Sequence, residues 1–293
     1  MTPLPDFYPS PLHLPFNSTA LQRDFVLAPP DADPGGPGFS VLLRGGDLLV
    51  EPAGEGHRLP AGLFPLGAGE GEVAPLYLGL WQGRPCRALS WPKDRDVPSG
   101  LVAESLLAAE PQLSIELLSL GGRAGQILHW EKNSRCCSRC GAATVPVPGE
   151  WGKKCSGCGY THYPHIHPCV IVLVRRGKEL LLTRKAEWPP GRYSLVAGFV
   201  DFGECFEEAV VREVREETGI EVRNVRYLGS QCWPFPSQVM AGFVADYAGG
   251  EVVVEEKELE DVRWFTPEAL PQLPPRRSIA RYIIDRALAG DWT

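Results

Sequence analysis

The sequence predicts an α/β protein in which a small β-rich domain and a metal-binding ribbon precede a larger α/β domain. Three observations support this prediction. Short apolar runs separated by Gly-rich turns occupy the first third of the chain, two Cys-x-x-Cys pairs lie near its middle, and strand patterns around one acidic helix follow. We place the domains at residues 1–130, 131–164 and 165–293 of the 293-residue chain.

Composition and charge narrow the class of protein. A net charge of −7 argues against a protein that wraps long nucleic acid through charge alone, although one capped end could still enter a pocket. The sequence has no apolar run near the ~20 residues that span a bilayer, and its first residues lack the basic and apolar regions of a secretion signal. We therefore expect a cytoplasmic protein, in which nine Cys favour metal binding over disulfides.

The amino-terminal domain is predicted from three successive patterns. Residues 1–35 are rich in Pro and polar residues and predict an extended arm. Residues 39–89 alternate apolar runs with Gly-rich turns, which predicts short β-strands. Residues 101–130 have helical apolar spacing, and we expect this helix to break at Pro111 and around Gly121-Gly122.

The two Cys pairs predict a zinc ribbon. Cys137 and Cys140 form the first pair, Cys155 and Cys158 form the second, and fourteen residues separate the pairs. Four thiolates complete a tetrahedral Zn²⁺ site and leave no open position, so the zinc is expected to be structural, one ion per chain. A coincidental set of buried thiols is the alternative, which two well-spaced pairs disfavour. His162 and its neighbouring His residues are expected to have structural or solvent roles.

The last domain is predicted from strand patterns on both sides of one helix. The expected strands lie near 170–174, 180–182, 222–227, 240–247 and 262–265, and a terminal helix covers about 278–289.

The helix that ends at Gly219 carries the main chemical signal, since glycine suits the left-handed turn after a helix. Its apolar face is predicted from three residues at helical spacing, Phe206, Ala209 and Val210. Glu213 and Glu217 continue that inward face, with Glu216 beside them. Carboxylates in one sequestered patch repel each other unless a cation lies among them, and Mg²⁺ or Mn²⁺ takes such oxygen ligands. The alternative is a solvated acidic helix end.

The spacing around this helix decides between the two alternatives. Gly198 is followed after five residues by Glu204 and, after seven more, by Arg212-Glu213-Val214-x-Glu216-Glu217-x-Gly219-Ile220. This matches the Nudix box at every defined position, so the chain resembles the Nudix hydrolases. The resemblance implies an α/β/α sandwich and hydrolysis of a nucleoside diphosphate linked to another group. It also implies a divalent metal held by Glu213, Glu216 and Glu217, with Glu204 and Arg212 steadying the loop and helix.

A second segment, residues 229–240, points to the substrate. Two aromatic residues held between prolines in Trp233-Pro234-Phe235-Pro236 form a stiff platform suited to stacking on a ring; a Pro-rich crossover between strands is the alternative. The segment resembles the array Ser-Gln-Pro-Trp-Pro-Phe-Pro-x-Ser of the NADH pyrophosphatase subfamily, with Cys232 in place of its first Pro and Gln238 in place of its final Ser. That subfamily also has a four-Cys ribbon, a Tyr-Pro pair after the ribbon and a Glu-Leu-x-x-x-x-Trp-Phe run. This chain has the matching residues Tyr163-Pro164, Glu258-Leu259 and Trp264-Phe265.

The resemblance implies a role for each matching residue. Glu213, Glu217 and Glu258 would coordinate the catalytic metals, with Glu216 contributing as a ligand or through water. Phe199 would stack on the adenine, together with Tyr163 of the partner subunit in a homodimer. The remaining implied substrate contacts are Glu150, Ala197, Ala280, Gln231, Cys232, Trp233, Pro234, Phe235, Pro236, Ser237 and Gln238.

The resemblance implies hydrolysis of NADH and NAD⁺ to nicotinamide mononucleotide and AMP, and we extend this expectation to NAD caps on RNA 5′ ends, which contain the same diphosphate. A broad dinucleotide pyrophosphatase acting on ADP-ribose, diadenosine polyphosphates or FAD is the alternative within the same enzyme class. A nucleotide-sensing module is disfavoured because it need not keep all the metal-binding carboxylates. A zinc-ribbon nucleic-acid binder is disfavoured because the chain is acidic and the ribbon has few basic residues.

Overall fold

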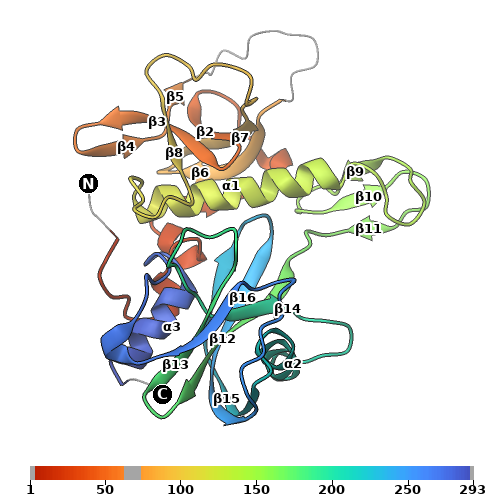
Figure 1. Cartoon of the computed structure of the whole chain (residues 1–293). Helices are drawn as coiled ribbons and strands as arrows, with labels where there is room; N and C mark the ends of the chain where they lie inside the picture. The colour runs from red at the N-terminus through yellow and green to blue at the C-terminus, as the bar shows by residue number, and fades with distance from the viewer. Residues whose placement is uncertain (1–3, 63–73, 291–293) are drawn as a thin grey trace. The chain divides into compact units, whose positions relative to one another are not determined.

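A computed structural model describes residues 4–62 and 74–290 (Figure 1). Contacts divide the chain into two compact units. Within the described residues, the first unit contains Leu4 and the segments 15–62, 74–166 and 233–237, and the second contains 5–14, 167–232 and 238–290. In the part of the chain that the structure describes, no helix is long and apolar enough to cross a membrane.

A β-sheet forms most of the amino-terminal part of the first unit. Its strands are β1 (Phe25–Leu27), β2 (Gly38–Arg44), β3 (Asp47–Ala53), β4 (Gly56–Arg58), β5 (Ala61–Gly62), β6 (Leu76–Trp81), β7 (Arg84–Ser90) and β8 (Val102–Ser105). They follow the order β1-β6-β7-β2-β3-β4, with β5 on β2 and β8 on β3. β2 and β7 are parallel, and the buried Val41, Leu49 and Leu78 belong to the core. The β-rich amino-terminal domain is confirmed.

The expectation of an extended arm at the amino terminus is wrong for the described residues. Short 3-10 turns at Pro11–His13 and Ser18–Leu21 shape this segment. Leu14, Phe16 and Leu21 are at most 2% exposed. Their segment is rich in Pro and polar residues, so the sequence did not reveal that they belong to the core.

Helix α1 (Ile115–Asn133) runs without a break across Gly121-Gly122, so the predicted interruption there is wrong. A Cβ on Gly121 would lie 2.8 Å from Leu106, and one on Gly122 would lie 2.7 Å from both Phe16 and Pro234. The glycines are therefore needed for close packing rather than for a turn. The helix begins after Pro111, with the Ser114 hydroxyl accepting a hydrogen bond from the Leu117 amide at 3.3 Å.

The ribbon follows α1 in the chain and completes the first unit. It consists of β9 (Thr144–Pro146), β10 (Lys153–Cys155) and β11 (Thr161–His162), with β10 in the middle and antiparallel to both neighbours. One Cys-containing turn precedes β9, and the other connects β10 to β11. The short strands leave the ribbon little apolar core of its own, as is typical of units that a metal stabilises.

The second unit is a sheet covered by helices on both faces (Figure 1). Its strands are β12 (His167–Arg176), β13 (Glu179–Arg184), β14 (Val196–Phe199), β15 (Glu221–Trp233), β16 (Gln238–Gly249) and β17 (Asp261–Phe265), in the order β15-β16-β12-β13-β17, with β14 on β12. The central pair, β12 and β16, is parallel.

Adjacent residues of β16 show that α2 (Phe206–Thr218) and α3 (Ile279–Leu288) cover opposite faces of this sheet. Phe243 packs in the core cluster that contains the apolar residues of α2. A Cβ on its neighbour Gly242 would lie 2.8 Å from Ile283 of α3. Successive side chains of a strand point to opposite faces, so the unit is an α/β/α sandwich, as predicted.

Candidate active site

Gly198 of β14 allows the Glu213 carboxylate to lie directly against the strand. A Cβ at position 198 would be 2.0 Å from Cδ of Glu213. Glu213 is 8% exposed, and burial raises the pKa of its carboxyl group although Arg212 opposes that rise. The first glycine of the motif therefore makes room for one of its carboxylates.

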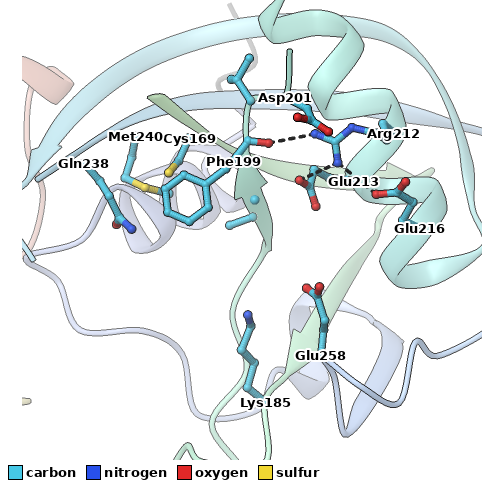
Figure 2. A pocket seen from close by; sticks show the side chains of 13 residues that line it. Cys169, Lys185, Phe199, Asp201, Arg212, Glu213, Glu216, Gln238, Met240 and Glu258 are labelled. Carbon is cyan, nitrogen blue, oxygen red and sulfur yellow. Dashed lines mark hydrogen bonds and ion pairs between the residues drawn. The ribbon is translucent and has the colours of Figure 1, made fainter. Parts of the chain in front are cut away.

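Arg212 on α2 connects the loop after β14 to the acidic face of the helix (Figure 2). Its guanidinium donates two hydrogen bonds to Glu204, at 2.5 and 2.8 Å, and one to the carbonyl of Phe199 at 2.9 Å. It also contacts Glu213 at 2.8 Å and Glu216 at 3.0 Å. The hydrogen bonds from Arg212, together with one from the Asp201 amide, lower the pKa of Glu204 to about 2. Arg212 therefore holds the loop and two helix carboxylates in place.

Glu217 is the most deeply buried carboxylate of the site. It is 2% exposed, and neither of its oxygens has a hydrogen-bond partner among the described residues. Burial raises its pKa to about 8, and Glu213 and Glu258 add to the rise while Lys185 opposes it. A buried carboxylate without a partner is costly unless it is neutralised. A divalent cation among these oxygens would provide that neutralisation, so the donor set fits a hard metal ion.

A pocket of about 580 Å³ lies over this face of the helix (Figure 2). It is lined by Cys169, Lys185, Ala197, Gly198, Phe199, Val200, Asp201, Arg212, Glu213, Glu216, Gln238, Met240 and Glu258. Glu258, which comes from the segment before β17, lies close enough to Glu213 and Glu217 to raise the pKa of each. The structure thus brings together the carboxylates that the sequence placed in the site.

The pKa of Glu217 predicts how pH affects the metal-free protein. The folded state keeps the Glu217 proton up to a pH of about 8, whereas the unfolded chain loses it near 4.5. Between these values the folded state binds more protons, so its free energy of unfolding should fall as pH rises, by up to ~1.4 kcal/mol per pH unit. Urea unfolding of wild type and Glu217→Gln across this range, without added divalent cation, measures the effect. The same slope in both proteins would contradict this assignment.

The predicted substrate residues of the second unit fall into two groups. Ala197, Phe199 and Gln238 line the pocket, and Phe199 is 54% exposed. Gln231 does not line it: its side chain is fully buried, donates to the carbonyl of Arg277 and accepts from the Ile279 amide, each at 2.7 Å. Ala280, in the first turn of α3, is 4% exposed. The hydrogen bonds of Gln231 with Arg277 and Ile279 hold the start of α3 in place.

The aromatic array packs within the first unit. Trp233 and Phe235 are half-buried, with ring centroids 5.2 Å apart, and Phe16 meets both rings edge-on, at 5.8 and 5.3 Å. Pro234 and Ser237 are buried, while Pro236 is exposed. The loop therefore has aromatic support that the local sequence did not reveal.

Glu150 and Tyr163 also belong to the first unit. The Tyr163 hydroxyl donates to Glu150 at 3.1 Å, and Tyr163 is 54% exposed. Cys232 ends the segment of the second unit that precedes the array and is half-buried. Glu150 and Tyr163, which the resemblance had each assigned to the substrate, are thus hydrogen-bonded to one another.

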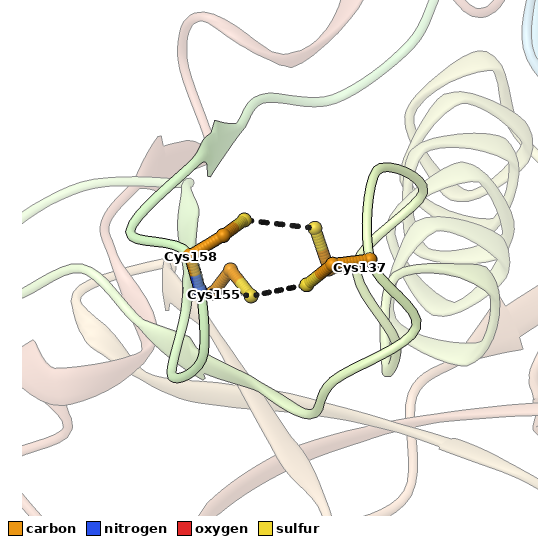
Figure 3. A group of neighbouring side chains, drawn as sticks. Cys137, Cys155 and Cys158 are labelled. Carbon is orange, nitrogen blue, oxygen red and sulfur yellow. Dashed lines mark hydrogen bonds between the residues drawn. The ribbon is translucent and has the colours of Figure 1, made fainter.

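The ribbon cysteines form a compact set of sulfur atoms (Figure 3). The Sγ atoms of Cys137, Cys140, Cys155 and Cys158 all lie within 4.8 Å of one another. The Cys137–Cys158 and Cys140–Cys155 separations are 3.8 and 3.4 Å. A disulfide needs about 2.05 Å, whereas four sulfurs at ~2.3 Å from one Zn²⁺ lie about 3.8 Å apart. The geometry fits zinc.

One set of contacts favours the thiolate of Cys155, and another contact positions Cys137. Amide N–H groups of Cys158 and Gly157 point at Cys155 Sγ from 3.3 Å each, and these hydrogen bonds lower the pKa of Cys155. His162 is buried, with Nε2 at 3.3 Å from Cys137 Sγ. Sequence reasoning left His162 outside the site. The structure places it against a ligand sulfur, where it can orient that ligand.

Comparisons with known proteins identify the family of the chain. Three family models match: an NADH pyrophosphatase-like rudimentary NUDIX domain over residues 37–130, an NADH pyrophosphatase zinc ribbon domain over 132–163 and a NUDIX domain over 165–287. A Pseudomonas fluorescens protein named NAD-capped RNA hydrolase NudC is 44% identical over 86% of this chain and 91% of its own length. A Pseudomonas aeruginosa protein of the same name is 44% identical over 72% and 76%. These matches cover all three parts of the chain.

Proposed function

Because the chain belongs to the Nudix hydrolases that carry an NADH pyrophosphatase zinc ribbon, we propose that it hydrolyses the diphosphate of NADH and NAD⁺ to nicotinamide mononucleotide and AMP. We extend the proposal to NAD caps on RNA 5′ ends, which contain the same diphosphate. The observation that carries it is the pocket that Glu213, Glu258 and the exposed Phe199 line together. Carboxylates for a metal and a ring for a base are the two features that a nucleoside diphosphate requires.

We assign roles in metal binding to acidic residues of the site. Glu213, Glu217 and Glu258 would hold Mg²⁺ or Mn²⁺, with Glu216 as a further ligand or acting through water. Such a cation neutralises diphosphate charge and supplies a nucleophilic water at neutral pH. Arg212 would keep Glu213 and Glu216 aimed at the pocket, since it bonds both of them. The buried Glu217 has both oxygens available for a ligand among the described residues.

Substrate recognition would use exposed aromatic groups. Phe199 at the pocket would stack on the adenine, together with Tyr163 of the partner subunit in a homodimer; exposure of both side chains supports this proposal. Ala197 and Gln238 would contact the ligand from the pocket wall. We place the protein in the cytoplasm, where NAD⁺ and RNA occur together, with one structural zinc per chain in the ribbon.

Phe235→Ala tests whether the aromatic array selects the nicotinamide end. A stacked base contributes roughly 1–3 kcal/mol, so we expect kcat/KM to fall further for NADH than for ADP-ribose, which lacks nicotinamide. Phe202→Ala is the control, because Phe202 is fully exposed and does not line the pocket. Equal losses on both substrates would show that Phe235 only supports the loop through Phe16.

A substrate panel tests the proposed function itself. Purified protein with Mn²⁺ is given NADH, NAD⁺, ADP-ribose, FAD and NAD-capped RNA, and the products are identified by mass. Nicotinamide mononucleotide from NADH, and RNA with a 5′ monophosphate from the capped RNA, are the expected products. Faster hydrolysis of ADP-ribose and FAD than of both NAD substrates would instead identify a broad dinucleotide pyrophosphatase.

A further inference from the structure

Lys185 is a pocket cation that the metal-binding motif does not include. It follows directly after β13 and lines the same pocket as Glu213 and Glu258. In Figure 2 its side chain points into that pocket. It lies near enough to Glu217 to lower the pKa of that carboxyl group.

The two cations that line the pocket differ in their partners. Arg212 is committed to Glu204, Glu213 and Glu216 at 2.5 to 3.0 Å. The ammonium group of Lys185, in contrast, has no hydrogen bond or ion pair with any described residue. Lys185 is therefore the cation with hydrogen-bond donors left for a ligand.

An anionic substrate needs such a donor in this pocket. Asp201, Glu213, Glu216 and Glu258 all line it, and their charges would repel a diphosphate that approaches without compensation. A lysine ammonium is a compact point charge with three donors and a common phosphate ligand.

We propose that Lys185 binds the diphosphate group of the substrate directly. In this role it is a substrate-binding residue that acts independently of the metal-binding carboxylates. The proposal rests on the proposed function, because it requires that the pocket binds a substrate with a diphosphate group. The diphosphate is common to NADH and ADP-ribose, so Lys185 contributes equally to both. A purely structural role, in which Lys185 only balances the charge of Glu217, predicts changes in stability or metal affinity without loss of substrate affinity.

The test compares Lys185→Met, Lys185→Arg and a matched control, Lys178→Met, which removes an exposed lysine of the same unit outside the pocket. Dissociation constants for NADH, from its fluorescence, and for ADP-ribose, by competition, are measured without added Mg²⁺ or Mn²⁺. KM and kcat are then measured with Mn²⁺. Loss of one charge-assisted hydrogen bond should weaken binding about 10- to 100-fold.

Lys185→Met should raise the dissociation constant and KM for both substrates by the same factor, while Lys185→Arg restores most of the affinity and Lys178→Met changes neither. Unchanged affinity in Lys185→Met, or a loss confined to NADH, would overturn the proposal. Wild-type protein that neither binds nor hydrolyses NADH, yet hydrolyses another diphosphate, would contradict the proposed function instead. Lys185→Met tested on that other substrate would still decide the role of Lys185.

Discussion

Glu217→Gln is expected to lower kcat by on the order of 10²–10⁴ while the protein remains folded. Glu217 is 2% exposed and both of its oxygens lack hydrogen-bond partners among the described residues, so a ligand is the partner that fits them. Glutamine has nearly the same shape but no charge, so it should occupy the same space without binding a divalent cation strongly. Burial disfavours the charged form of Glu217, so the metal-free variant should be at least as stable as wild type at neutral pH.

Steady-state hydrolysis of NADH, circular dichroism and thermal melting of the same preparations separate chemistry from folding. Glu207→Gln is the matched control, since Glu207 lies in the first turn of α2, is exposed and does not line the pocket. Near-wild-type turnover in Glu217→Gln would mean that the carboxylates of α2 do not form the catalytic metal site.

Cys155→Ser is expected to reduce the zinc content from about one ion per chain to near zero and to unfold the ribbon. The four sulfurs lie within 4.8 Å of one another, and β10, which ends at Cys155, is the middle strand of the ribbon. Loss of one ligand should therefore lower the melting temperature and the yield of folded protein. Turnover per correctly folded molecule should change less, because these sulfurs are not among the residues that line the pocket.

Cys136→Ser provides the comparison for this result. Cys136 is exposed and adjacent to Cys137, but it is not one of the four clustered residues. Elemental analysis and melting curves of the two variants should differ clearly. Freshly purified wild-type protein without zinc, or equal zinc in Cys155→Ser and wild type, would contradict the assignment of these residues.

The parts of the structure that depend on fixed local spacing were predictable from the sequence. Gly198 and Glu213 are adjacent in space because the motif sets the length of the loop between strand and helix. Gly219 has φ 71°, the left-handed turn expected after α2. The four Cys meet because each pair occupies one turn of the ribbon. In each case a short stretch of chain determines the geometry.

Features that depend on partners distant in the sequence were not predictable. Nothing near Phe16 indicates that its ring meets Trp233 and Phe235. The glycines of α1 suggested a break because a glycine pair is typical of turns, whereas here Gly122 makes room for Phe16. Lys185 was missed because a single lysine after a strand carries no pattern. Sequence patterns reflect residues that are close along the chain. The features above depend on residues that are close only in the folded structure.

The packing of Phe16 on the aromatic loop has a consequence for the evolution and engineering of this enzyme. A minimal enzyme that starts near residue 165 would retain the metal-binding helix, but its Trp233–Ser237 loop would lose the aromatic ring that supports it. The segment that contains Phe16 can thus act as a scaffold for this loop. If the loop selects the substrate as proposed, substitutions around Phe16 should change specificity as well as substitutions in the loop itself.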